Sequence, residues 1–160
     1  MKEGVALAEA LGIPADVLTC AKASDDPEGF AERLLAGRSQ ILLAKQTDLY
    51  GHFFACCPRA PDATGAPTDI EVFDSQATDA QTVPSYLLGT EGGGLNGEPA
   101  DWLGRVLLGL KLDRGISLSF NCNPSQPSSS EGCLLHCLAR SATLDVSPAE
   151  FTKKAYAAFS

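Results

Sequence analysis

Short apolar runs separated by polar, turn-forming stretches dominate the middle of the chain. Residues 40–45 (QILLAK), 52–57 (HFFACC), 69–74 (DIEVFD) and 116–121 (ISLSFN) are such runs, and each has the length of a β-strand. The segment 58–68 contains three prolines and a glycine, which predicts a long hairpin connection between the second and third strands. We therefore expect a sheet whose neighbouring strands are mainly antiparallel.

Segments whose apolar residues recur at helical spacing lie before, between and after these strands. Asp25 or Asp26 can cap a helix that has Pro27 in its first turn and ends near Gly37. Ser147 begins a capping-box pattern before the last helix. The predicted helices cover residues 1–14, 27–37, 102–110, 132–144 and a segment from 148 onward.

The order of these elements indicates an α+β fold in a single domain, residues 1–160. The strand-rich core is expected over about 40–121, and a separate helix begins at about 132. A chain of this length can bury a real core without metal or disulfides.

Composition and charge exclude several classes of function. The chain is 44 % hydrophobic and 20 % charged, which is typical of a globular protein, and no apolar run approaches the length of a membrane span. Its formal charge of −8 argues against nucleic acid as the main partner, because phosphate binding needs a basic surface. A basic protein or peptide tail remains possible as a substrate.

Four polar residues occur in an order that suggests chemistry. His52 opens one apolar run, Asp74 closes another, and Cys133 begins a helical segment behind a Pro/Ser-rich loop that contains Gln126. A thiol nucleophile needs a base that holds it as thiolate, and the base needs an acid that orients it. The amide of Gln126 could donate a hydrogen bond to a developing oxyanion. The four residues therefore predict a cysteine acyl-transfer site.

The six cysteines have another interpretation, a zinc site made of Cys122, Cys133, His136 and Cys137. The spacing does not favour it, because three of these residues share one helix face and no CxxC motif is present. We expect Cys137 to lie in the core and His136 to be exposed or hydrogen-bonded. No metal or cofactor is predicted, and the cysteine pattern favours a reducing compartment over a disulfide framework.

The order His, Asp-Ser, Gln, Cys resembles the ubiquitin-like-protein proteases, the SUMO- and NEDD8-processing cysteine proteases related to the adenovirus protease. The matching stretch covers about 40–143. The chain departs from that signature in three places. Phe53 stands where the family has Trp, Glu131-Gly132-Cys133 replaces Asp-Cys-Gly, and Gln126 precedes the cysteine by seven residues where six are usual.

The resemblance implies a papain-like fold in which His52 is the base, Asp74 its orienter, Cys133 the nucleophile and Gln126 the oxyanion donor. It implies a cysteine protease or isopeptidase that cleaves a ubiquitin-like protein at its C-terminal glycine. The candidate substrate contacts are Phe53 and Trp102.

Two further possibilities remain open from the sequence. Residues 126–133 (QPSSSEGC) are also similar to the loop of bacterial effector acetyltransferases of the same fold, which transfer an acetyl group to Ser, Thr or Lys. A degenerate member of the fold could instead bind a ubiquitin-like partner without catalysis. The expected location is the cytoplasm or nucleus, or the host cytosol for a secreted effector.

Overall fold

The sheet at the centre of the molecule is mixed. The structure, a computed structural model, describes residues 2–45, 51–75, 101–120 and 132–159. In these residues five strands follow one another in space as they do in the sequence. They are β1 (Ala15–Thr19), β2 (Ser39–Lys45), β3 (Gly51–Pro61), β4 (Pro67–Phe73) and β5 (Ser117–Phe120). The α+β class is confirmed.

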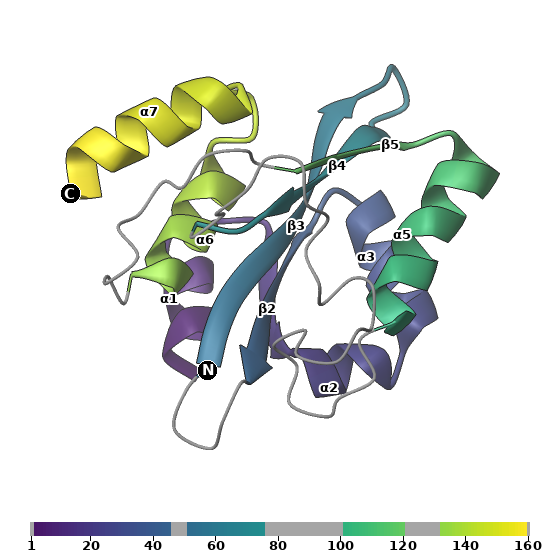
Figure 1. The fold of residues 1–160 in the computed structure, drawn as a ribbon, viewed down its shortest axis with the longest axis horizontal. Coiled ribbons are helices and arrows are strands. Elements are labelled where there is room, and N and C mark those ends of the chain that lie inside the picture. The colour runs from purple at the N-terminus through teal and green to yellow at the C-terminus, as the bar shows by residue number, and fades with distance from the viewer. Residues whose placement is uncertain (1, 46–50, 76–100, 121–131, 160) are drawn as a thin grey trace.

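Helices cover both faces of this sheet. They are α1 (Lys2–Ala10), α2 (Cys20–Ser24), α3 (Pro27–Leu35), α5 (Asp101–Arg114), α6 (Cys133–Ala142) and α7 (Pro148–Phe159). Helices α1, α6 and α7 lie on one face, and α2, α3 and α5 lie on the other (Figure 1). None of the helices in the described ranges is both long enough and apolar enough to cross a membrane.

The expectation of a mainly antiparallel sheet is wrong at both edges. β2, β3 and β4 pair antiparallel, whereas β1 runs parallel to β2 and β5 runs parallel to β4. The reason lies in the connections. Helices α2 and α3 separate β1 from β2, and α5 separates β4 from β5. A helical crossover returns the chain to the same end of the sheet, so the following strand is parallel.

The expected long connection over 58–68 is also wrong. β3 continues to Pro61, β4 begins at Pro67, and the turn between them is short. The Asp62 carboxylate organises this turn by accepting from the backbone N–H groups of Thr64 and Ala66, at 2.8 and 3.2 Å. Gly65 adopts φ +87°, a conformation that other residues rarely take.

The side chains of β3 point alternately to the two faces of the sheet, and the core consists of one apolar cluster on each face. Phe54 and Cys56 are fully buried on the face covered by α2, α3 and α5, whereas Ala55 and Cys57 are fully buried on the face covered by α1, α6 and α7. Successive strand residues point to opposite faces, so the apolar run 52–57 supplies both clusters. A strand that is buried on both faces is expected to be apolar throughout.

The expected caps fix two of the helices. The Asp26 carboxylate accepts from the N–H of Gly29 at 3.0 Å, and Pro27 follows as the first residue of α3. The Ser147 hydroxyl accepts from the N–H of Glu150 at 3.2 Å at the start of α7. Both caps satisfy donors that the first turn of a helix leaves unpaired.

Candidate functional site

His52 and Asp74 form the closest polar contact of the predicted site. His52 Nε2 lies 2.7 Å from Asp74 Oδ1. The strand ends explain this contact. His52 lies at the start of β3, and Asp74 follows the last residue of β4. Because the two strands pair antiparallel, these positions meet at the same end of the sheet.

Cys133 is the first residue of α6 and lies against the same histidine. Gly132 is the N-cap of this helix and contributes no capping side chain. The half-buried thiol of Cys133 is hydrogen-bonded to the His52 side chain and to the backbone N–H groups of Phe53 and Leu134. Because Nε2 of His52 faces Asp74, the ring nitrogen left for the sulfur is Nδ1.

These contacts favour a thiolate beside an imidazolium. Burial raises the pKa of Cys133, but the hydrogen bonds from His52 and from the Phe53 N–H outweigh it, so the pKa lies below its ordinary value of 9.0. Burial lowers the pKa of His52, but the hydrogen bonds to Asp74 and Cys133 outweigh it and raise the pKa from 6.5 to about 9. The shifts have opposite directions because each charged group stabilises the other.

The other cysteines are chemically different from Cys133. Burial raises the pKa of Cys57 to about 12 and raises that of Cys56 and Cys137 well above 9.0. These thiols remain protonated at neutral pH and are inert inside the core. The prediction that Cys137 is a core residue is confirmed, since it is 0 % exposed.

Of the other predicted site residues, Gln126 lies outside the described residues, as does Cys122 of the zinc interpretation. Trp102 is 8 % exposed on α5 and packs edge-on against Phe30, with ring centroids 5.2 Å apart. This burial leaves the Trp102 ring little surface for a substrate, and we remove it from the candidate site.

Phe53 follows His52 in the chain and contacts Cys133 through its backbone. Its N–H is one of the donors to the Cys133 sulfur. Its side chain is half-buried and packs against the cluster beneath α1, α6 and α7. His136, expected to be exposed or hydrogen-bonded, is 1 % exposed, and burial lowers its pKa. It is therefore neutral at physiological pH.

The structure gives no support to a metal centre in the part of the chain that it describes. No group of three or more His, Cys, Asp or Glu side chains in the described ranges has a geometry that could hold a metal ion. The five described cysteines are all thiols, with no disulfide among them.

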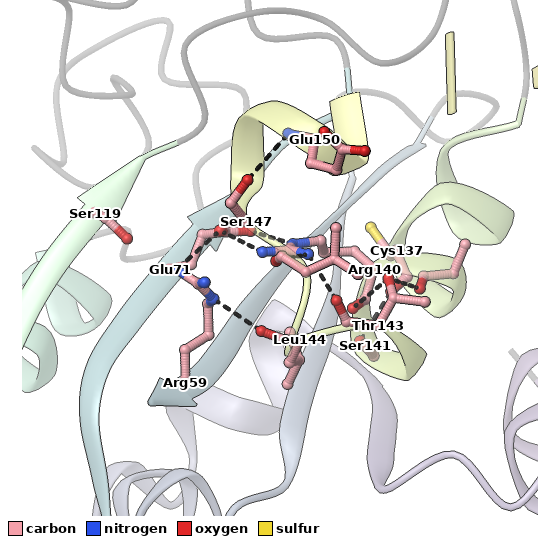
Figure 2. Close-up of polar contacts among 12 residues, drawn as sticks. Arg59, Glu71, Ser119, Cys137, Arg140, Ser141, Thr143, Leu144, Ser147 and Glu150 are labelled. Carbon is pink, nitrogen blue, oxygen red and sulfur yellow. Dashed lines mark hydrogen bonds and ion pairs between the residues drawn. The ribbon is translucent and has the colours of Figure 1, made fainter. Parts of the chain in front are cut away.

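Sequence reasoning missed a buried ion pair between α6 and the sheet. Glu71 of β4 and Arg140 of α6 are both 0 % exposed and bind each other through two hydrogen bonds (Figure 2). The sequence does contain a signal for this ion pair. Glu71 interrupts the apolar run IEVF, and Arg140 lies where the periodicity of α6 predicts an inward-facing residue.

Comparison with known proteins adds no family to this description. No protein-family model matches the chain, and neither the curated proteins nor the solved structures contain a match. The functional argument therefore depends on the geometry of the site.

Proposed function

We propose that this protein is a cysteine-dependent acyl-transfer enzyme, with Cys133 as nucleophile, His52 as base and Asp74 as the residue that orients the base. The observation that carries the proposal is the position of His52. Its ring binds Asp74 at 2.7 Å and also the Cys133 thiol at the start of α6. Nucleophile, base and orienting acid in mutual hydrogen-bond contact are the general signature of covalent acyl transfer.

The reaction that fits this site best is hydrolysis of a peptide or isopeptide bond. The Cys133 thiolate attacks the carbonyl carbon, and the His52 imidazolium then gives its proton to the leaving amine. Water, deprotonated by the now neutral His52, cleaves the thioester and regenerates the thiol. The N–H of Cys133, in the first turn of α6, has no intrahelical acceptor and is a donor for the oxyanion. Gln126 is the proposed second donor.

For the substrate we propose the C-terminal glycine of a ubiquitin-like protein. The order of the four residues and the Asp-Ser at the end of β4 support it, through the resemblance to the ubiquitin-like-protein proteases. A nucleophile at the N-terminus of a helix, packed on a sheet that carries the base and the acid, is also what the papain-like fold of that family requires. A reducing compartment, cytoplasmic or nuclear, suits the five free cysteines of the described chain.

The test uses ubiquitin, SUMO and NEDD8 probes that carry a C-terminal electrophile. We expect one of them to form a covalent adduct with the folded protein, and Cys133→Ala to abolish the adduct. Cys137→Ala is the matched control, because Cys137 lies one turn further along the same helix but is fully buried. This variant should react like the unmodified protein.

The outcomes separate the alternatives. Absence of an adduct with every probe, from a protein that unfolds cooperatively, contradicts the protease proposal. Incubation with radiolabelled acetyl-CoA then tests the effector-type acetyltransferase, in which Cys133 would carry the label. A protein that binds a ubiquitin-like partner but reacts with neither reagent is a catalytically silent binding domain.

A further inference from the structure

The Glu71–Arg140 pair is the most completely buried charged contact in the described part of the chain. Arg140 Nε donates to Glu71 Oε2 at 2.7 Å, and Arg140 Nη2 donates to Glu71 Oε1 at 3.0 Å. Both side chains are 0 % exposed. This two-point geometry fixes direction as well as distance, because the guanidinium fork matches the two carboxylate oxygens.

The remaining donors of Arg140 hold the end of its own helix. Arg140 Nη1 donates to the carbonyl oxygens of Thr143 and Val146, at 2.9 and 3.0 Å (Figure 2). The guanidinium also lies over the Phe151 ring of α7, 5.2 Å from its centroid. Arg140 therefore joins β4, the carbonyls that follow α6, and the first turns of α7.

Helix α6 carries both Cys133 and Arg140, and the end of β4 carries both Glu71 and Asp74. The distance between the two residues is similar in each case. Cys133 and Arg140 are two helical turns apart, so they share one face of α6 and are separated by about 10 Å along its axis. Glu71 and Asp74 are three residues apart at the end of β4, which is also about 10 Å. One end of the helix is thus tied to Glu71, and the other end presents the sulfur to His52.

A gain in folding stability does not by itself explain why a buried ion pair occurs at this position. Removing two charges from water costs several kcal/mol per ion, and apolar residues of similar volume often replace a buried pair with no loss of stability. The pair borders the apolar cluster to which Phe151 belongs, and Arg59 Nη1 also lies 3.9 Å from Glu71 Oε1. An apolar contact at this place would pack equally well but would set neither the rotation nor the depth of α6.

We propose that Glu71 and Arg140 are positioning residues, which fix the rotation and depth of α6 so that the Cys133 sulfur faces His52. This inference rests on the proposed function, because it assigns the pair a part in that reaction. Neither residue contacts the sulfur or the imidazole in any interaction described above. Their effect is exerted through the helix and the strand.

The experiment replaces the ion pair by apolar residues of similar size, in the double variant Glu71→Leu/Arg140→Met. The readout is the rate of Cys133 alkylation by iodoacetamide between pH 5 and 9.5, with the label located by fragment-ion mass spectrometry. The matched control is Asp16→Leu/Arg38→Met. It removes another two-point ion pair, with contacts of 3.1 and 3.2 Å, on the edge strand β1.

We expect the double variant to unfold cooperatively, but its Cys133 thiol to react more slowly because the sulfur no longer faces His52. The midpoint of its alkylation profile should rise by at least about one pH unit, which makes Cys133 about tenfold slower at pH 6.5. The control variant should keep the profile of the unmodified protein. A folded double variant whose profile is unchanged would overturn the positioning role, whatever its melting temperature.

A second variant keeps the proposal testable if the double variant does not fold. Arg140→Lys retains the buried positive charge but loses the two-point fork, and it should shift the midpoint in the same direction by a smaller amount. An unshifted profile in this folded variant refutes the inference. Failure of the proposed function looks different, since the unmodified protein would then show an ordinary thiol midpoint that His52→Ala leaves unchanged.

Discussion

The charge on Asp74 is the simplest part of the site to remove without changing its shape. Asp74→Asn keeps the side-chain volume and an oxygen that can still accept from His52 Nε2, 2.7 Å away. It removes the negative charge that favours the imidazolium. We expect the variant to fold, to retain the hydrogen bond in weaker form, and to lose much of the reactivity of Cys133 at neutral pH.

The size of the effect follows from the shift of His52. Its pKa rises from 6.5 to about 9, which corresponds to about 3 kcal/mol in favour of the charged ring. Asp74 and Cys133 share this stabilisation and also offset the cost of burial. A hydrogen bond to a charged group contributes about 1.5–3 kcal/mol, so the thiolate–imidazolium form should become about 10- to 100-fold less populated.

Asp74→Asn should shift the low-pH and the high-pH limits of the thiolate–imidazolium form in opposite directions. The thiolate is lost as pH falls through the lowered pKa of Cys133, and a less charged His52 moves this limb to higher pH. The imidazolium is lost as pH rises through about 9, and Asp74→Asn moves that limb to lower pH. The window in which both charged forms coexist should therefore narrow from both ends.

The assay measures alkylation of Cys133 by iodoacetamide under pseudo-first-order conditions from pH 5 to 9.5. Three cysteines share the tryptic peptide 115–140, so fragment ions must assign the label. The control is Asp62→Asn, the same chemical change in the turn between β3 and β4, at a residue bound to Thr64 and Ala66. At pH 6.5 we expect a decrease of about tenfold or more for Asp74→Asn and none for Asp62→Asn.

Two results would refute this reasoning. The first is an Asp74→Asn profile that superimposes on that of the unmodified protein. The second is a midpoint for the unmodified protein close to that of a free thiol, which would mean that His52 does not hold the thiolate in solution.

Three further predictions concern stability and reactivity. Gly37→Ala should lower the free energy of unfolding by about 1–2 kcal/mol, because Gly37 has φ +85°. Gly109→Ala should raise it by about 0.5–1 kcal/mol, because Gly109 lies in the middle of α5 and nothing stands within 4 Å of an added Cβ. Denaturant titration of both variants measures the contrast. Asp26→Ala should cost about 1 kcal/mol in the same titration, because it removes the N-cap of α3. Cys57, with a pKa of about 12, should be labelled only as fast as the protein unfolds, and labelling as fast as that of Cys133 in native protein would contradict its burial.

Local patterns predicted most of the elements, but not how the outer strands pair. The helices at Pro27–Leu35, Asp101–Arg114 and Pro148–Phe159 have caps or apolar periodicity that depend on neighbouring residues only. β1 was missed because Ala15–Thr19 is short and is stabilised by parallel pairing with Ser39–Leu43, more than twenty residues away. The parallel pairing of β4 with β5 was predictable in principle, since a helix was expected between these two strands.

The proximity of His52, Asp74 and Cys133 followed more directly from the sequence than the packing around them did. Strand ends placed His52 next to Asp74, and a helix start placed Cys133 beside them, because these positions follow from element boundaries. The Glu71–Arg140 pair depends on which face of α6 meets which strand, and that is fixed only by tertiary packing. Trp102 illustrates the opposite error, since an aromatic residue on an apolar helix face belongs to the core by default.

The balance of charge beneath α6 explains why orientation matters so much at this site. Moving the proton from Cys133 to His52 creates two charges but leaves the total charge of the site unchanged, because Asp74 stays negative in both forms. At the far end of the same interface Glu71 pairs with Arg140, and Arg59 Nη1 lies 3.9 Å from Glu71 Oε1. Activation of the thiol therefore requires no net charging of a half-buried region, and its free energy is decided by how directly the new thiolate faces the imidazolium and the N–H groups of Phe53 and Leu134. A small rotation of α6 would weaken each of these contacts together, while leaving the apolar core nearly intact.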